Sequence, residues 1–163
     1  MAMEAITKVM QTLEAMVAAH LQMLDVTKAK RKTLLKGDIA GLQRLLPLEL
    51  KYTAQIEQLE EQRQTEVQAL LRNTLHAGDS YTLEQLLNNL DDTAAKTKLE
   101  KIADQLRSLV QEIAELNETN QQLIQASLSY VQYSLGLFVQ NEPAIGYGPK
   151  AAKRYANLLD AKI

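Results

Sequence analysis

The strongest constraint on the fold is a run of mostly apolar residues, from Leu99 to Leu137, spaced alternately three and four residues apart without a slip. This spacing places the side chains on one face of a single long helix and favours left-handed supercoiling with neighbouring helices. A start near Thr93 and an end near Gln140 make the helix roughly 70 Å long, at about 1.5 Å per residue. A helix longer than a compact domain needs other long helices alongside it.

The first half of the chain predicts those partner helices. Apolar residues at helical spacing predict a helix over 3–36. Gly37 suits the position just past a helix, and Asp38 suits the N-cap of the next. We therefore expect a tight reversal and an antiparallel second helix over 39–75. Pro47 predicts either a kink in that helix or a separate short first helix.

The remaining segments are shorter and differ in kind. Residues 76–80 have the composition of a loop, and Thr82 and Gln85 form a capping box that predicts a short helix. Residues 141–163 contain two prolines and two glycines close together, which predict a flexible tail. The expected fold is all-α: an antiparallel bundle of long coiled-coil-like helices with a short extra helix, comprising residues 1–140, followed by a flexible C-terminal tail over 141–163.

The residues that enzymes and metalloproteins need are scarce. The chain has no Cys and two His, and the Glu-x-x-His motif of metal sites in helical bundles does not occur. Gly-rich phosphate loops and Gly-x-Ser-x-Gly motifs are also missing. We therefore expect no enzyme activity, no metal and no cofactor. A net charge of −2 gives no global case for nucleic acid or for an anionic membrane, and the basic run 28–36 is explained by its place at a helix C-terminus.

The chain is expected to be cytoplasmic. Its first ten residues contain Glu4 and Lys8 and lack the continuous apolar stretch of a secretory signal. No run approaches the roughly 18 apolar residues that a membrane-spanning helix needs. We therefore expect no membrane insertion.

The long helix changes in character after Asn120. An Asn in a helix seam costs stability and specifies register or partner number, so it is as well explained by local helix pairing as by binding. Beyond it the apolar coverage is wider than one seam, which indicates either burial in the bundle or an exposed partner-binding wall. The candidate partner-binding residues are Asn120, Leu123, Ile124, Leu128, Val131, Leu135 and Phe138.

Three pieces of the chain, in order, resemble the FlgN family of flagellar export chaperones. The segment 117–130 resembles that family's Asn-x-x-Asn-x-x-Leu-Ile-x-x-Ser-Leu pattern on its last long helix, and 147–150 resembles its Tyr-Gly-Pro-x-Gly tail motif, with Ala151 in place of the final Gly. The residues that look like the family's first helical hairpin are Lys32, Leu34, Leu35, Asp38, Leu42, Glu49, Leu59 and Arg63. The resemblance covers about residues 21–150.

The resemblance implies a cytoplasmic chaperone for hook–filament junction proteins. Such a chaperone holds the C-terminal helical segments of its clients, prevents their early assembly and delivers them to the flagellar type III export gate. The candidate residues after Asn120 would then bind the client. Tyr147 and Tyr155 would contact the export gate, since spaced Tyr residues suit a segment that folds on contact; the alternative is a plain disordered terminus.

Two other functions remain open from the sequence. A coiled-coil adaptor or oligomeric scaffold without chaperone activity would explain the heptads equally well, although not the tail motif. A small helical-bundle enzyme would use Arg63 and Lys51 as anion anchors, but it lacks an acid–base constellation.

Overall fold

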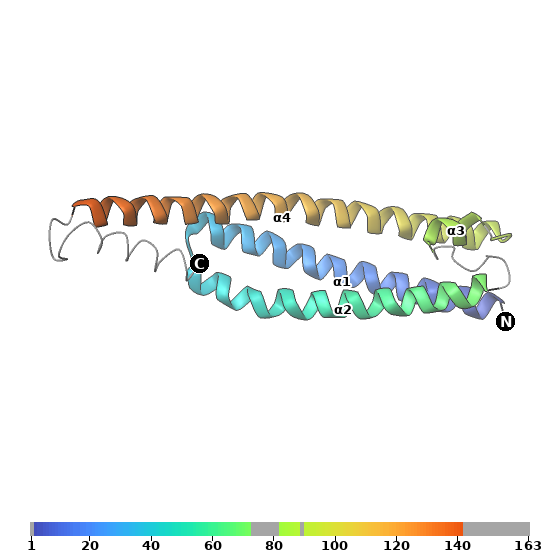
Figure 1. Cartoon of the computed structure of the whole chain (residues 1–163). Helices are drawn as coiled ribbons and strands as arrows, with labels where there is room; N and C mark the ends of the chain where they lie inside the picture. The colour runs from blue at the N-terminus through green and yellow to red at the C-terminus, as the bar shows by residue number, and fades with distance from the viewer. Residues whose placement is uncertain (1, 73–81, 89, 142–163) are drawn as a thin grey trace. The chain divides into compact units, whose positions relative to one another are not determined.

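The computed structural model describes residues 2–72, 82–88 and 90–141, and these contain four helices and no strand. The helices are α1 (Ala2–Lys36), α2 (Ile39–Leu71), α3 (Leu83–Asn88) and α4 (Thr93–Asn141) (Figure 1). The all-α prediction is confirmed, and the bounds of α1 and α4 lie within one residue of those expected. The predicted loop over 76–80 lies outside the described residues, as does the side chain of Gln85 in the proposed capping box. The predicted tail over 141–163 also lies outside them, apart from Asn141, which is the last residue of α4.

The reversal between α1 and α2 is built as its sequence predicts. Gly37 has a positive φ of 66°, which residues with a Cβ rarely adopt. Asp38 Oδ1 accepts a hydrogen bond of 2.9 Å from the backbone N–H of Gly41, so Asp38 caps α2. Gly41 is buried, and a Cβ there would collide with the Asp38 carboxylate. The chain therefore turns back at once, and α2 runs antiparallel to α1 (Figure 1).

Gly37→Ala is expected to lower the free energy of unfolding by about 1 kcal/mol, because the left-handed conformation strains a residue with a Cβ. Nothing lies within 4 Å of the position such a Cβ would take, so strain rather than collision sets the effect. Urea unfolding followed by circular dichroism measures the change. An unchanged midpoint would mean that the turn relaxes without cost.

Pro47 does not divide α2. The helix is continuous from Ile39 to Leu71, so the alternative of a separate short helix is wrong. Pro47 is exposed, and its ring removes a single backbone hydrogen bond, whereas the helix on both sides of it packs along α1. Packing against a neighbouring helix here outweighs the local cost of the proline.

One hydrophobic core joins all four helices. Val9, Leu13 and Met16 of α1 lie in one cluster with residues of the other three helices, and Leu13 is fully buried. The remaining buried members of this cluster are Val67, Leu71, Leu86, Leu87, Leu99 and Leu106. Burial of Leu99 and Leu106 confirms that the alternating spacing marks the packed face of α4 before Asn120, whereas Tyr130 and Leu137 of the same run are exposed. Each buried Leu or Val contributes about 1.5–3 kcal/mol through burial of its side chain.

The chain divides after Asn120 into two compact units, Met1–Asn120 and Gln121–Ile163. The hydrophobic core belongs to the first unit, and the last part of α4 belongs to the second. The boundary expected between a helical core and a tail, after residue 140, stays a prediction because residues 142–163 are not described.

Candidate functional site

The second unit carries an apolar stripe along α4. Its residues are spaced four and three apart, which places them on one face of the helix, and they are Ile124, Leu128, Val131, Leu135 and Phe138. Phe138 is 62% exposed and Val131 48% exposed, whereas the other three are half-buried. Leu123 is also half-buried. Six of the seven predicted partner-binding residues thus lie on a surface that solvent reaches wholly or in part.

Further exposed apolar side chains lie on the same part of α4. Tyr130, Tyr133 and Leu137 are 72%, 67% and 42% exposed. They are spaced three and four residues apart and lie together on the opposite side of the helix from the stripe, with Tyr133 pointing most directly away from it. Large exposed apolar surfaces are uncommon on monomeric proteins and mark interaction sites. The last third of α4 is therefore the best candidate for binding another protein.

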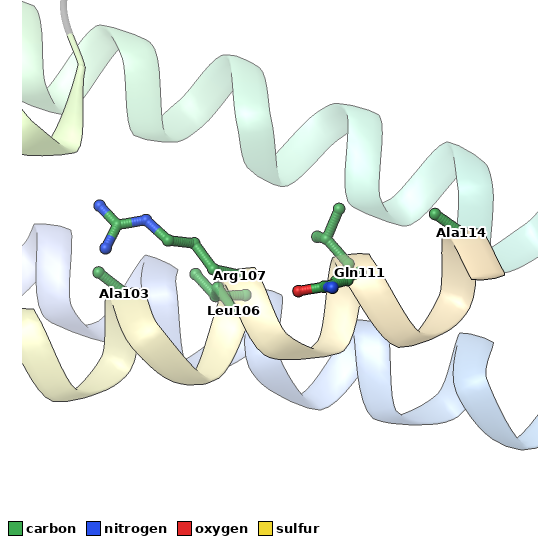
Figure 2. A pocket seen from close by; sticks show the side chains of 6 residues that line it. Ala103, Leu106, Arg107, Gln111 and Ala114 are labelled. Carbon is green, nitrogen blue, oxygen red and sulfur yellow. The ribbon is translucent and has the colours of Figure 1, made fainter.

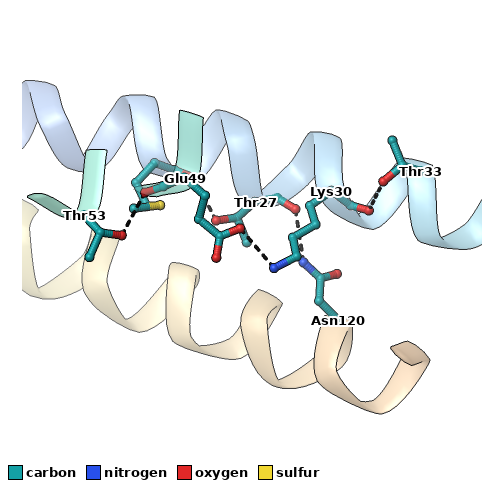
Figure 3. A network of polar contacts seen from close by, with 7 residues as sticks. Thr27, Lys30, Thr33, Glu49, Thr53 and Asn120 are labelled. Carbon is teal, nitrogen blue, oxygen red and sulfur yellow. Dashed lines mark hydrogen bonds and ion pairs between the residues drawn. The ribbon is translucent and has the colours of Figure 1, made fainter. Parts of the chain in front are cut away.

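Asn120, the seventh predicted residue, is placed differently. It is 2% exposed, and its Nδ2 donates a hydrogen bond of 3.2 Å to the backbone carbonyl of Thr27 on α1 (Figure 3). Its Oδ1 is buried and has no hydrogen-bond partner among the described residues. The contact fits the helix-pairing alternative, because it fixes α4 against α1 at the last residue of the first unit. A role in partner binding stays a prediction for Asn120.

Asn120→Leu is expected to raise the free energy of unfolding by about 1 kcal/mol, because it removes a buried oxygen that lacks a donor. Asn120→Ala is expected to lower it by about 2 kcal/mol, because it also leaves a cavity. Urea unfolding of the two variants measures both changes. If Asn120→Leu were less stable than the wild-type chain, the Oδ1 atom would have a donor after all.

Two lysines of the basic run at the end of α1 form ion pairs with glutamates of other helices. Lys30 Nζ lies 3.0 Å from Glu49 Oε2 of α2, and both side chains are largely shielded from solvent (Figure 3). Lys28 Nζ lies 3.6 Å from Glu112 Oε1 of α4, at an exposed position. Both pairs link helices of the first unit, so these two cations serve the bundle rather than a ligand.

Arg63 is held by a carboxylate of its own helix. Its Nε donates to Glu60 Oε2 at 2.7 Å, and its Nη2 donates to Oε1 of the same carboxylate. The hydrogen bond from Arg63 lowers the pKa of Glu60, and partial burial opposes that shift. Lys51 lies 5.9 Å from the ring centre of Tyr52, its neighbour in sequence. Arg63 and Lys51 thus each have a partner within the protein, whereas an anchor for an anionic ligand is expected to be free to bind it.

A hollow of about 350 Å³ lies in the first unit and was not predicted. Its lining combines apolar residues such as Ile56 and Val110 with the polar side chains of His20, Glu49 and Glu57. A second hollow of about 370 Å³, next to it on α4, shares Val110 and Ala114 (Figure 2). Only a weak sequence signal indicates these hollows. It consists of the small or apolar residues that lie beside the packed face of α4. Such a mostly apolar surface offers packing to a partner.

The other titratable candidates show no catalytic arrangement. His20 is buried, and its Nδ1 lies 2.6 Å from the Met16 carbonyl oxygen one turn earlier. Within the described part of the chain, no three His, Cys, Asp or Glu side chains gather as a metal site would require. Tyr147 and Tyr155 lie outside the described residues. No described helix is both long and apolar enough to cross a bilayer.

Comparison with known proteins agrees with this picture of a helical binding protein. Neither a search of curated proteins nor a search of solved structures finds a match. The sequence model of the FlgN family, described as FlgN protein, matches residues 1–154. That match spans nearly the whole chain, including α1, α2, α4 and the segment that contains Tyr147. The chain therefore belongs to the FlgN family of flagellar export chaperones.

Proposed function

We propose that this protein is a cytoplasmic type III export chaperone that binds the C-terminal helical segments of flagellar hook–filament junction proteins. By covering those segments it prevents their premature assembly, and it then delivers them to the export gate. The observation that carries the proposal is the exposed apolar stripe on the last third of α4, in a member of a chaperone family.

The lengths of the helices support an open stripe. The hydrogen bond from Asn120 to Thr27 fixes α4 against α1 at one level. Lys36, the last residue of α1, is nine residues after Thr27, whereas α4 continues for twenty-one residues after Asn120. The last twenty-one residues of α4 thus belong to the second unit, beyond the residue at which α1 holds the helix. A client helix can supply an apolar partner for the exposed side chains of the stripe.

The stripe suits an amphipathic helix as its ligand. Helix-in-groove recognition uses apolar anchors at helical spacing, and a few large side chains carry most of its energy. Leu128, Val131, Leu135 and Phe138 provide such anchors, with Leu123 and Ile124 beside them. Asn120 would act at the edge of this client-binding surface, where its main effect is to hold α4.

Delivery is assigned to the C-terminal tail. In this proposal Tyr147 and Tyr155 contact the cytoplasmic part of the export gate, because Tyr offers a large contact area with few rotamers to restrict. Client binding and gate docking then occupy separate segments of the chain. No catalytic group is needed for either step, which agrees with a chaperone family rather than an enzyme family.

Size-exclusion chromatography with and without a purified junction protein tests the proposal. We expect the two proteins to elute together, and a junction protein without its C-terminal helical segment to elute separately. A coiled-coil scaffold would instead elute as its own oligomer, unchanged by the junction protein. That result would contradict the proposed function.

A further inference from the structure

The reversal between α1 and α2 exposes apolar residues in the first unit. Ile39 and Leu50 are each 71% exposed, Leu35 is 62% exposed and Leu46 is 42% exposed. Ile39, Leu46 and Leu50 are spaced seven and four residues apart, so they lie on one outward face of α2. We call these four residues the reversal patch. It lies on a different unit from the client-binding surface.

The same segment is strongly basic. Between Lys28 and Lys51 there are seven basic residues and two acidic ones, in a chain whose net charge is −2. Of the two acids, Asp38 caps α2 and Glu49 pairs with Lys30. The exposed cations that have no acidic partner among the described residues are Arg31, Lys32, Lys36, Arg44 and Lys51. The segment that contains the reversal patch thus carries five exposed cations without an acidic partner among the described residues.

We propose that the reversal patch is a peripheral docking site for an anionic lipid bilayer. Helices that lie in a membrane interface combine a Leu- and Ile-rich face with flanking Lys and Arg. The apolar side chains enter the boundary between head groups and acyl chains, and the long basic side chains reach lipid phosphates. Docking is shallow, because no described helix is apolar enough to cross the bilayer.

The apolar component favours lipid over nucleic acid. Phosphates of a nucleic acid would satisfy the cations, but they would leave Ile39, Leu46 and Leu50 in water. None of the four patch residues is aromatic, so the patch offers no platform for base stacking. An anionic bilayer offers both phosphates for the cations and an apolar layer for the patch. The proposal is independent of the client-binding function, since the two surfaces share no residue.

Co-sedimentation of the full-length chain with vesicles tests the site. Binding is expected to phosphatidylcholine vesicles that contain about one third phosphatidylglycerol, not to phosphatidylcholine alone, and it is expected to weaken at about 0.5 M salt. Lys32→Gln with Arg44→Gln is expected to lower the partition coefficient by about 25-fold. Ile39→Ser with Leu50→Ser is expected to lower it by about tenfold or more.

Matched pairs elsewhere in the first unit serve as controls. Lys98→Gln with Lys101→Gln removes the same charge from exposed positions on α4, and Met3→Ser with Val110→Ser removes exposed apolar side chains. Both control pairs are expected to bind vesicles within about twofold of the wild-type chain, because neither lies at the reversal patch. Circular dichroism is expected to show that each variant retains its helices, because the substituted side chains are exposed.

Several results would overturn the proposal. One is equal binding to neutral and anionic vesicles, or no binding to either; another is an equal loss of binding in the control pairs. Binding of a single-stranded RNA probe that depends on Lys32 and Arg44 but not on Ile39 and Leu50, without vesicle binding, would assign the cations to nucleic acid. Self-association lost in the Ile39 and Leu50 pair, again without vesicle binding, would assign the patch to a second copy of the chain.

Discussion

Val131→Asp is expected to weaken client binding at least about 100-fold, because truncation or disruption of a central apolar anchor removes much of the energy of a helix-in-groove interface. Val131 is 48% exposed and lies in the middle of the stripe, between Leu128 and Leu135. A carboxylate there either stays hydrated, which keeps the client helix away, or is buried without water, which costs a large amount of binding free energy. Isothermal titration calorimetry with a purified junction protein measures the loss.

Tyr133→Asp is the matched control for this prediction. Tyr133 is more exposed than Val131, lies two residues away on the same helix and points away from the stripe. The same acidic residue at this position is expected to leave client affinity within about threefold. If Val131→Asp were to unfold the chain while Tyr133→Asp did not, the stripe would be part of the protein's own core and the proposed surface would be wrong.

Truncation after Gln140 is expected to separate client binding from delivery. The shortened chain keeps α1, α2, α3 and nearly all of α4, so its client affinity is expected to stay within about twofold of the full chain. Export is expected to fall by about tenfold or more, the scale of losing principal contacts at an interface. Secretion of the junction protein into the medium, in cells that carry only the truncated chaperone, measures export.

Tyr147→Ala in the full-length chain narrows that test to one side chain. It is expected to reproduce part of the export defect with unchanged client affinity, because it removes a ring contact and leaves the stripe intact. Normal export by the truncated chain would remove the tail from the proposed mechanism. Loss of client binding on truncation would place the tail within the client-binding surface and contradict the division between the two functions.

Local sequence patterns predicted most of the fold. The alternating three- and four-residue spacing gave the extent of α4, and the burial of Leu99 and Leu106 follows directly from it. Gly37 and Asp38 predicted the reversal because each needs only its immediate neighbours to act. Pro47 shows the limit of this reasoning. Pro47 does lack one backbone hydrogen bond, but the packing of α2 against α1 keeps the helix continuous through it.

The sequence predicted which residues belong to the candidate site, but it did not predict which of them are buried and which are exposed. Spacing placed Asn120 and Val131 on the same face of α4, yet one is buried against α1 and the other is exposed. Periodicity gives the direction of a side chain on its own helix, and it does not give how far the neighbouring helices extend. The hydrogen bond from Asn120 to Thr27 and the pairing of Arg63 with Glu60 likewise depend on how the residues meet in space.

The most direct test of the central claim is hydrogen–deuterium exchange of the full-length chain, alone and bound to a junction protein. The account predicts that peptides covering residues 123–139 gain protection on binding, because the client helix covers the stripe and slows local opening of α4. Peptides at the start of α1 are expected to remain unchanged. Protection confined to residues 2–120, with none gained over 123–139, would contradict the account and place the client on the first unit.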